Sequence, residues 1–434
     1  MLDIKLFREN PDIIRESEKR RFRDPAIVDQ VIEFDRLWRE KKQEINELRR
    51  LRNEKSAEIG KIKKKDKKAD ISGIQNEVKK MKADLEQAEK DVEDLFKKRE
   101  ETRYKVGNIV HESVPVGQGE DANVIVRTWG KPAEPANWRQ GHADMVELLD
   151  VAVIEKAAEV AGSRTYYLKN DLVFLNLALV NFALDFLERE RGFHVFWTPY
   201  FLRKEIMEGA SELADFEEQL YSDQKEDVFF IATSEQTLVA LHYNEIIEPE
   251  NLPLRYAGFS TNFRREAGAH GRDFKGIFRV HQFEKVEQFI YADPENSWQY
   301  HEELIDNAEK MFQKLELPYR VINIASGELN DNAAKKYDIE VWFPAQQTFR
   351  ETVSCSNCTD FQARKLNIRV GRTGADKEFL HTLNSTAIAT SRVICAILEN
   401  FQEEDGTVKI PCALHPYMGG RIEIKPKKSK KNEN

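Results

Sequence analysis

The sequence has little cysteine and no long apolar run. Only 4 of its 434 residues are cysteine, too few for a disulfide-stabilised scaffold. No apolar stretch approaches the roughly 18 residues that a membrane-spanning helix needs. The opening residues, MLDIKLFREN, contain no apolar signal-peptide core. We therefore expect a cytoplasmic protein in a reducing environment, with no membrane partner.

A second absence concerns nucleotide binding. The chain contains no GxxxxGK[ST] loop, so any nucleotide chemistry that it performs does not use a P-loop. The segment GQGEDA at 117–122 fits a relaxed dinucleotide-binding pattern. Because no helical pattern follows it, we interpret this match as chance.

Charge is distributed unevenly along the chain. The formal net charge of −9 argues against a general nucleic-acid coat protein. Residues 31–110, however, contain 23 Lys and Arg against 18 Asp and Glu. A basic segment joined to an acidic remainder is typical of a protein in which one part meets a polyanion. The run KPKKSKK at 425–431 is a second basic segment, for which a solvated surface is the simpler interpretation.

The basic segment predicts two long helices. Glycine and proline are absent between residues 25 and 60 and again between residues 73 and 107. In both stretches apolar residues recur in alternating steps of three and four, which indicates a coiled coil. The short break at 67–73, with Ser72 as a helix cap and Gly73 as a turn residue, makes the helices antiparallel. We expect an arm of roughly 50–60 Å. The pattern alone leaves open whether this arm mediates oligomerisation or binds nucleic acid.

The most informative region lies between residues 255 and 290. Two strand-like runs, RYAGFSTNF and GIFRVHQFEKVEQFI, flank the polar loop REAGAHGRDFK. Strand alternation places one set of side chains of the second run on a single face, namely Arg279, His281, Phe283, Lys285 and Glu287. Arg264 and Glu266 share a face next to the first run. Such a charged and aromatic face is costly unless something binds there, and a solvated, salt-bridged face is the alternative.

These residues resemble a known family. FRREAGAHGRDFKGIFRVHQFEKVE is similar to motif 2 of class II aminoacyl-tRNA synthetases, and specifically to the archaeal and eukaryotic form found in seryl-tRNA synthetases. The helical pattern at 171–191, with the strand HVFWT and Pro199, resembles motif 1. IATSE at 231–235 resembles the family's serine-binding loop, residues 349–357 its metal and ATP strand, and residues 383–392 motif 3. The resemblance covers essentially the whole chain.

The resemblance implies an α+β fold with two domains. Residues 1–110 would form the tRNA-binding domain with its long antiparallel coiled-coil arm. Residues 111–138, which contain three prolines, would form a linker or an irregular pair of strands. Residues 139–434 would form the catalytic domain, a mainly antiparallel β-sheet flanked by helices, and end in the basic tail. The family forms homodimers through motif 1.

The reaction that the resemblance implies has two steps. Serine attacks ATP to give seryl-adenylate and pyrophosphate, and the seryl group then passes to the 3′ end of tRNA(Ser), and to tRNA(Sec) where one exists. The attacking serine carboxylate is already an anion, so charge neutralisation and alignment should do most of the work. Lysines at the arm's tip would bind the tRNA; they are Lys61, Lys63, Lys64 and Lys65.

The resemblance also assigns the site residues. Arg264, Glu351 and Arg392 would be catalytic. ATP would be bound by Arg264, Glu266, Arg279, Val280, Phe283, Glu351, Thr352, Val353, Ser354 and Arg392. Serine would be bound by Thr233, Glu235, Glu287, Asn384 and Thr386. Glu351 and Ser354 would hold Mg²⁺, which prefers oxygen ligands, although strict alternation puts these two residues on opposite faces unless a bulge intervenes.

Histidines and cysteines add little to this assignment. We interpret His270 as a loop residue that meets the tRNA end, and His281 as a positioning residue. Cys355 and Cys358 form a C-x-x-C pair, but no second close pair accompanies them, so we expect no zinc.

Three alternatives remain open. A class II synthetase for threonine or proline is disfavoured because no anticodon-binding domain is evident after motif 3. A paralogue that activates an amino acid for a carrier protein, or that only binds ligands, should have lost the arm or a motif arginine. A coiled-coil scaffold with an inert body does not explain the charged face between residues 279 and 287.

Overall fold

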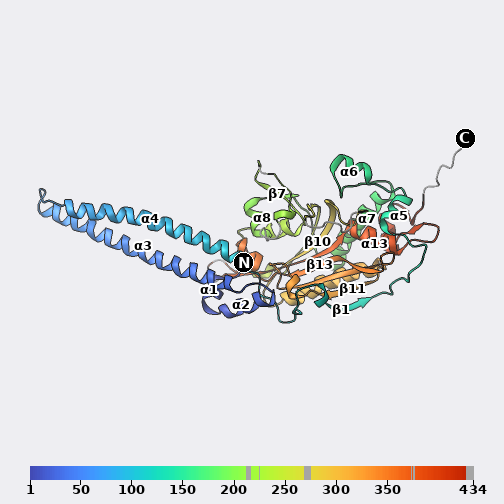
Figure 1. The fold of residues 1–434 in the computed structure, drawn as a ribbon, viewed down its shortest axis with the longest axis horizontal. Helices are drawn as coiled ribbons and strands as arrows, with labels where there is room; N and C mark the ends of the chain where they lie inside the picture. Colours follow the sequence, from blue (N-terminus) through green and yellow to red (C-terminus); the bar gives the residue numbers. More distant parts are fainter. Residues whose placement is uncertain (212–216, 224, 268–274, 373, 375–376, 427–434) are drawn as a thin grey trace. The chain divides into compact units, whose positions relative to one another are not determined.

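The computed structural model describes residues 1–211, 217–223, 225–267, 275–372, 374 and 377–426. The chain forms two compact units, Met1–Ile109 and Val110–Asn434 (Figure 1). No helix in these described ranges is both long enough and apolar enough to cross a membrane.

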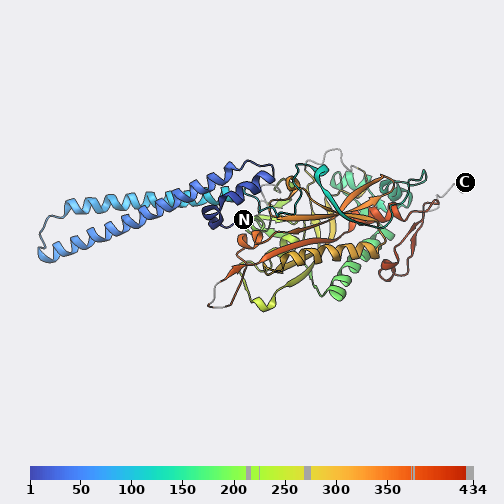
Figure 2. The same ribbon diagram turned by 90° about the horizontal axis from the view of Figure 1, so that it is seen from below.

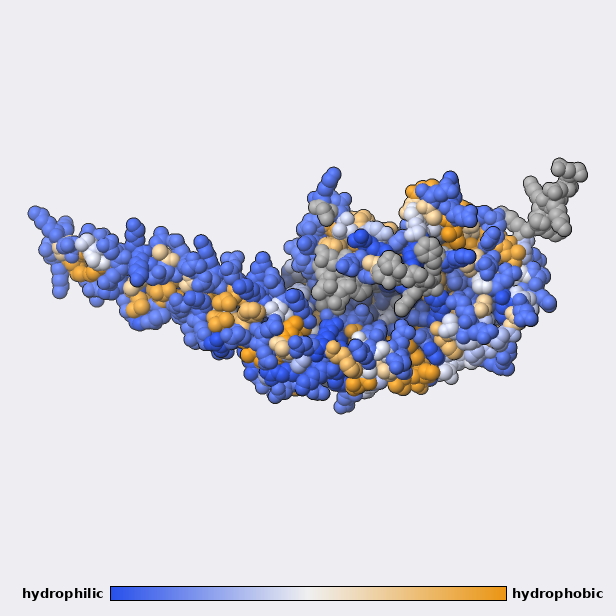
Figure 3. All heavy atoms as spheres, in the orientation of Figure 1, coloured by the Kyte–Doolittle hydropathy of each residue, from blue (hydrophilic) through white to orange (hydrophobic). Residues whose placement is uncertain are grey.

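The first unit contains the predicted pair of long helices. Two short helices, α1 (Ile4–Glu9) and α2 (Pro11–Arg20), precede α3 (Ala26–Lys65) and the antiparallel α4 (Ser72–Arg103). Ile45 of α3 and Leu85 and Ala88 of α4 form a buried layer between the helices. Most other apolar residues between the two helices are only partly buried. Figure 3 accordingly shows apolar patches that alternate with hydrophilic stretches along the arm.

The turn at the arm's tip differs from the prediction. α3 continues through Gly60 to Lys65, and Gly73 lies inside α4 rather than in the turn. Ser72 is the first residue of α4 and not its cap. The Asp70 carboxylate accepts a hydrogen bond from the Ser72 backbone N–H at 2.9 Å, so the aspartate satisfies a free donor at the start of the helix. The predicted antiparallel connection is nevertheless present.

A buried ion-pair group stabilises the base of the arm. The carboxylate of Asp35 in α3 accepts hydrogen bonds from Arg8 of α1 at 2.7 Å and from Arg99 of α4 at 2.9 Å. The Arg99 guanidinium also lies 4.5 Å from the ring centroid of Trp38. Because both charges of the Asp35–Arg99 pair are buried, removal of one partner would leave the other uncompensated.

The second unit is built on an eight-stranded sheet. Its strand order is β1-β11-β12-β13-β16-β10-β9-β4. The strands are β1 (Val124–Trp129), β4 (His194–Trp197), β9 (Leu254–Phe263), β10 (Gln282–Ala292), β11 (Tyr319–Asn323), β12 (Lys335–Phe343), β13 (Thr348–Asn357) and β16 (His381–Ala389). All neighbours pair antiparallel except β4 and β9, which are parallel. The predicted α+β class with a mainly antiparallel sheet is therefore confirmed.

Helices cover one face of this sheet. The main core unites apolar residues of the strands with those of α7 (Asp171–Asp185), α11 (Ser297–Lys314) and α13 (Thr390–Asn400). Figure 2 shows α11 running along the sheet. Val286 and Ile290 of β10 point into this core, whereas Lys285 and Glu287 point to the opposite face. At residues 285–287 the period of two thus separates core-facing from cavity-facing side chains. Further along β10, Phe289 and Tyr291 follow the parity of Glu287 and lie in a second hydrophobic core.

Shorter elements complete the unit. Further α-helices in the described ranges are α5 (His142–Leu148), α6 (Glu155–Ala161), α8 (Lys204–Ala210), α10 (Glu235–Ala240) and α12 (Phe361–Lys365). Small strand groups are β5 (Phe201–Arg203), β7 (Val228–Phe230) and β6 (Ser222–Asp223), then β15 (Glu378–Phe379), β14 (Arg369–Val370) and β8 (Ile246–Ile247). Two further pairs are β17 (Val408–Lys409) with β18 (Glu423–Ile424), and β2 (Ala152–Val153) with β3 (Tyr167–Leu168).

Two segments differ from the sequence-based expectation. Residues 111–138, predicted as a linker or an irregular pair of strands, contain one strand, β1, which pairs with β11 at the edge of the main sheet and has a register shift between Ile125 and Arg127. The strand predicted to begin at Gly276 begins only at Gln282. Gly276 has a φ of +82° and a Cβ there would lie 2.8 Å from the His142 ring, so an extended path with a larger residue is excluded at this point.

Candidate active site

A cavity of about 270 Å³ opens on the polar face of the central strands. Its walls come from β10, β13 and β16, from the start of α13, and from the segments that follow β7 and β9. The predicted site residues that line it are Thr233, Glu235, Arg264, Glu266, Arg279, Val280, Phe283, Glu287, Glu351, Thr352, Ser354, Asn384, Thr386 and Arg392. Five separate stretches of sequence therefore meet at one cavity.

Val353 is the exception among the predicted residues. Its side chain is fully buried in the main core and does not line the cavity. Only its backbone can face a ligand. His270, which the sequence analysis interprets as a loop residue that meets the tRNA end, lies outside the described residues.

A bulge in β13 brings Glu351 and Ser354 to the same face. Ile339 of β12 pairs with Val353 of β13, and the next residue of β12, Glu340, pairs with Glu351. Thr352 is therefore an extra residue in β13. Its hydroxyl donates a hydrogen bond to the Ile339 carbonyl at 3.1 Å. Since a bulge shifts the alternation by one residue, both side chains line the cavity. This is the bulge that the spacing of the two residues requires.

A second bulge lies in β16. β10 pairs Val286 with Ile388 and Glu287 with Thr386, which leaves Ala387 as the extra residue. Asn384 and Thr386 lie before the bulge and share the face of Glu287. Ala389, three residues beyond Thr386, also lines the cavity, and it leads directly into α13, which carries Arg392.

Three arginines concentrate positive charge at one end of the cavity. Arg264 follows β9, its Nε donates to the Ala232 carbonyl at 3.3 Å, and its guanidinium lies 5.3 Å from the Phe283 ring centroid. Arg279 donates to the Glu266 carboxylate at 3.0 Å. Burial and the neighbouring Arg392 lower the pKa of Arg264. This end therefore has an excess of positive charge suited to an anion.

Arg392 and Glu351 form an ion pair across the cavity. The Arg392 Nη1 lies 3.1 Å from the Glu351 carboxylate and donates to the Glu351 carbonyl at the same distance. Burial alone would raise the pKa of Glu351, but Arg392, Lys336 and Arg264 hold it below its usual value. Glu351 is therefore an anion at neutral pH, as a cation ligand must be.

The other end of the cavity is acidic and rich in hydrogen-bonding groups. The Glu235 carboxylate accepts hydrogen bonds from Gln362 at 2.9 Å and from Asn384 at 3.1 Å. The Glu287 carboxylate accepts one from the Thr386 hydroxyl at 3.3 Å. Burial, and then the charge of Glu287, raises the pKa of Glu235 to about 7. Burial also raises the pKa of Glu287.

Lys285 and Gln362 belong to this end and were not assigned from the sequence. The Lys285 ammonium donates to the Thr233 hydroxyl at 2.7 Å and forms an ion pair with Glu287. Burial lowers the pKa of Lys285. Strand alternation had placed Lys285 on the charged face, and that signal was sufficient to find it. Gln362 lies in α12, just after the strand that ends at Asn357, and no pattern in the sequence identifies it.

His281 joins the two strand ends of the motif 2 region. Its Nδ1 donates a hydrogen bond to the Arg264 carbonyl at 2.8 Å, and its backbone N–H donates to the Arg164 carbonyl at 3.0 Å. His281 does not line the cavity. The contact fixes the backbone from which the Arg264 side chain projects.

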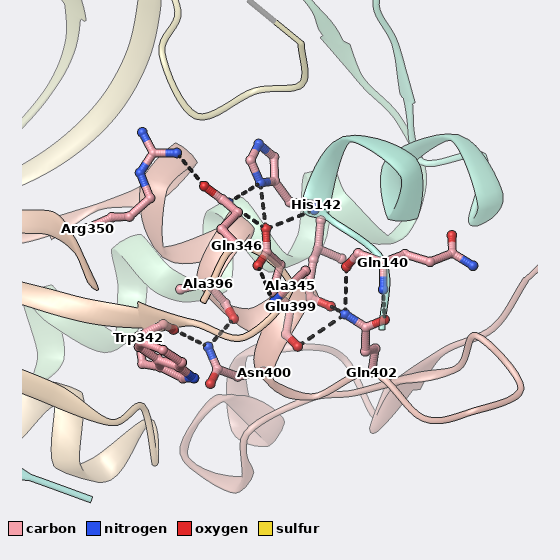
Figure 4. A network of polar contacts seen from close by, with 11 residues as sticks. Gln140, His142, Trp342, Ala345, Gln346, Arg350, Ala396, Glu399, Asn400 and Gln402 are labelled. Atoms are coloured by element: carbon pink, nitrogen blue, oxygen red, sulfur yellow. Dashed lines mark hydrogen bonds and ion pairs between the residues drawn. The ribbon is translucent and has the colours of Figure 1, made fainter. Parts of the chain in front are cut away.

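A buried polar network connects the C-terminal end of α13 to neighbouring segments (Figure 4). The Glu399 carboxylate accepts hydrogen bonds from the backbone N–H of His142 at 3.1 Å, from that of Ala345 at 3.2 Å, and from the Gln346 amide at 2.8 Å. It also contacts the His142 ring at 2.9 Å. Gln346 in turn accepts from Arg350 at 2.8 Å. The network thus ties the helix that carries Arg392 to the turn that precedes Glu351.

Metal and thiol chemistry have few candidates. In the part of the chain that the structure describes, no group of three or more His, Cys, Asp and Glu side chains is arranged to hold a metal ion. Cys355 and Cys358 are buried free thiols. Burial raises the pKa of Cys355 well above its usual value, which keeps it protonated and unreactive.

The tip lysines of the arm are exposed. Lys61, Lys63, Lys64 and Lys65 lie in the last turns of α3, and Lys67 and Lys68 in the connection that follows. Exposed lysines that project from a helix end can contact phosphates without contributing to the fold.

Comparison with known proteins defines the class. Residues 216–401 match the family model of the tRNA synthetase class II core domain (G, H, P, S and T). Together with the antiparallel sheet and its cavity, this match makes the chain a class II aminoacyl-tRNA synthetase. Residues 1–110 match the seryl-tRNA synthetase N-terminal domain. The chain belongs to the seryl-tRNA synthetase family.

Individual relatives support this placement over the full length. A serine–tRNA ligase of Methanosphaera stadtmanae is 54% identical over 98% of this chain and 100% of that protein. The cytoplasmic serine–tRNA ligase of Arabidopsis thaliana is 48% identical over 97% of this chain and 95% of its own. The structure of seryl-tRNA synthetase from Pyrococcus horikoshii complexed with ATP has a TM-score of 0.92 and 47% identity, covering 99% of this chain and 100% of that one.

Proposed function

We propose that the cavity forms seryl-adenylate from L-serine and ATP and then transfers the seryl group to the 3′ end of tRNA(Ser), and of tRNA(Sec) where one exists. The observation that carries the proposal is the division of one cavity into an arginine-rich end and an acidic end. The first suits a triphosphate, and the second suits an amino group and a hydroxyl. Adenylate formation requires these two ligands to lie end to end.

The arginine end performs the chemistry by charge and alignment. The serine carboxylate attacks the α-phosphorus of ATP, its oxygen forms the new bond, and pyrophosphate leaves with the electron pair. Arg264, which lies beside the Phe283 ring, would contact the α-phosphate, with the adenine stacked on Phe283. Arg392 would contact the γ-phosphate, and Arg279 and Glu266 would fix the rest of the nucleotide. Fixed charges that already point at the reacting phosphate need no reorganisation during the step.

Mg²⁺ is proposed to bind beside Glu351 and Ser354. The residues fit the ion, because Mg²⁺ in nucleotide sites is commonly held by one or two protein oxygens, substrate phosphates and water. Such a site needs no cluster of three protein ligands. When bound, the ion would neutralise charge on the phosphates and favour departure of pyrophosphate. Glu351 would then exchange its contact with Arg392 for the cation, which frees the arginine for the γ-phosphate.

The acidic end is proposed to select serine. The carboxylates of Glu235 and Glu287 would bind its ammonium group, and Thr233, Asn384 and Thr386 would complete the pocket. Rejection of alanine depends on buried polar groups that lose their partner when the hydroxyl is missing. The test is ATP–pyrophosphate exchange without tRNA for serine, threonine, alanine and cysteine. Exchange with serine alone supports the proposal. Exchange with another amino acid would contradict the pocket assignment, and no exchange would favour a paralogue.

The raised pKa of Glu235 predicts a pH effect on serine binding. The carboxylate must be ionised to pair with the serine ammonium. Because its pKa is about 7, protonation competes with serine as the pH falls below 7. We expect the KM for serine in pyrophosphate exchange to rise roughly tenfold between pH 7.5 and pH 6, with little change in kcat, because bound serine keeps the carboxylate ionised. In Glu235→Gln the KM should be raised but nearly independent of pH. The same pH dependence in the variant would show that another group is responsible.

The enzyme is proposed to act as a cytoplasmic homodimer through the motif 1 region. β4 is the outermost strand of the main sheet, and its Val195 and Trp197 are 41% and 76% exposed. On α7, Val173, Phe174 and Leu177 are also exposed. Exposed apolar residues concentrated on an edge strand and a neighbouring helix mark an interface.

A charge placed on this surface should separate the subunits. We expect the wild type to sediment as a dimer at micromolar concentration and Trp197→Asp to sediment as a monomer with reduced exchange activity, because burial of an unpaired carboxylate is costly. Val116→Asp is the matched control, since Val116 is 62% exposed but lies outside motif 1. A monomeric wild type, or a Trp197→Asp variant that remains dimeric, would contradict the proposed interface.

A further inference from the structure

Asp338 is a buried carboxylate that no motif accounts for. It lies in β12 directly opposite Ser354 of β13, and its side chain is 9% exposed. Directly opposed residues of an antiparallel pair share a face and lie next to each other. Asp338 is therefore the neighbour of one of the two residues that are proposed to hold Mg²⁺.

The hydrogen-bonding capacity of Asp338 is only partly used. Its Oδ1 is buried and has no hydrogen-bond partner within the described ranges of the chain. The nearest cation, the Lys336 ammonium, lies 4.0 Å from the other oxygen, Oδ2. A buried carboxylate oxygen without a donor is costly, so its retention in this position points to a donor that arrives with a ligand.

The neighbouring carboxylates are better compensated. Glu340 lies two residues further along β12, opposite Glu351, and accepts a hydrogen bond from Arg320 at 2.5 Å. Glu351 is paired with Arg392 at 3.1 Å. All three carboxylates share one face of the β12–β13 pair because strand residues two apart point the same way and opposed residues are adjacent. Only Asp338 among the three has no arginine partner in the described residues.

Mg²⁺ bound at Ser354 would turn the Ser354 hydroxyl into such a donor. A hydroxyl oxygen that faces a cation keeps its proton, which then needs an acceptor, and groups that contact metal ligands fix their orientation. We propose that Asp338 is a positioning residue for the Mg²⁺–ATP complex: its Oδ1 accepts a hydrogen bond from the Ser354 hydroxyl and so holds the Ser354 oxygen toward the ion. This inference rests on the proposed Mg²⁺ site at Glu351 and Ser354.

The test follows metal binding in the absence of turnover. Mn²⁺ replaces Mg²⁺, and water-proton relaxation reports the complex of the full-length protein with Mn²⁺ and a non-hydrolysable ATP analogue, without serine. We expect Asp338→Asn to weaken Mn²⁺ binding roughly tenfold and to raise the Mg²⁺ concentration that gives half-maximal exchange by a similar factor, with the KM for serine unchanged. Glu340→Gln is the matched control on the same strand, and we expect its Mn²⁺ affinity to stay within about twofold of the wild type because its carboxylate already has a partner.

Two results separate the inference from the function on which it rests. If Glu351→Gln weakens Mn²⁺ binding and Asp338→Asn does not, the role of Asp338 is wrong and the metal site stands. If neither variant alters Mn²⁺ binding, the metal site itself is wrong. Should Asp338→Asn fail to fold, Asp338→Ala is the second variant, and unchanged Mn²⁺ affinity in it would also overturn the proposal.

Discussion

Replacement of Arg264 by alanine is expected to abolish serine activation without harming the fold. The guanidinium lies inside the cavity, where it donates a hydrogen bond to the Ala232 carbonyl at 3.3 Å. Loss of a preorganised charge at the reacting phosphate should slow pyrophosphate exchange roughly 10³-fold or more. Since desolvation and the charge of Arg392 already lower the pKa of Arg264, its positive charge is unfavourable in the free protein. The variant should therefore unfold at the same temperature as the wild type or a higher one.

Arg265 provides the matched control for this experiment. It is the next residue in the chain and is exposed, so Arg265→Ala removes the same charge and a similar volume without entering the cavity. We expect exchange within about threefold of the wild type, as for surface substitutions in general. Near-normal exchange by Arg264→Ala would refute its assigned role. A variant that loses both activity and folding cooperativity would instead make Arg264 a structural residue.

Removal of the distal arm is expected to separate the two steps of the reaction. Deletion of residues 42–90, with a short glycine–serine turn between Lys41 and Asp91, cuts the arm where these two side chains already pair at 3.5 Å. It retains the Asp35–Arg99 pair at the arm's base. Serine-dependent pyrophosphate exchange should be unchanged, because the described residues that form the cavity all belong to the second unit. Charging of tRNA(Ser) should fall roughly 10²-fold or more through a higher KM for tRNA, since contacts to several phosphates are lost.

A milder variant tests whether the positive charge of the arm's tip accounts for the predicted loss of tRNA charging. Replacement of Lys61, Lys63, Lys64 and Lys65 by alanine keeps the helix, because alanine favours helical structure, and removes only the positive tip. We expect weaker tRNA binding and a shallower dependence of affinity on salt concentration. Lys79, Lys80 and Lys82 of α4, replaced together, are the control for loss of charge elsewhere on the arm. Normal charging by the deletion variant at moderate salt would refute the arm's role.

The sequence predicted the parts of the structure that depend on periodicity. The three-four spacing from Val31 to Ile62 predicts α3, because a long solvent-exposed helix can bury apolar residues only along one stripe. Alternation predicts the polar face of β10, which includes Lys285 and Glu287. The requirement for a bulge between Glu351 and Ser354 followed from the same geometry, since a period of two cannot place residues three apart on one face.

The parts that sequence patterns missed depend on contacts between distant segments. Gln362 donates to Glu235 across 127 positions of the chain, and no local pattern encodes such a pair. The late start of β10 at Gln282 reflects the close approach of Gly276 to His142, which is a tertiary contact. At the arm's tip, we predicted Ser72 as the N-terminal cap of the second helix because serine is a favoured capping residue. Asp70 accepts the hydrogen bond from the helix start instead. Serine and aspartate have similar capping preferences, so residue type alone does not distinguish the two positions.

The bulge at Thr352 has a consequence for how this enzyme tolerates change in length. β12 pairs Ile339 with Val353 and Glu340 with Glu351, so Thr352 is the extra residue of β13 at this point. Its removal would leave a regular strand in which Glu351 and Ser354 are two residues apart and still share one face. Removal of Cys355 would instead make Thr352 an ordinary strand residue and turn Val353 and Ser354 to the opposite faces. β13 should therefore tolerate the loss of one residue at the bulge far better than the loss of one residue beyond it.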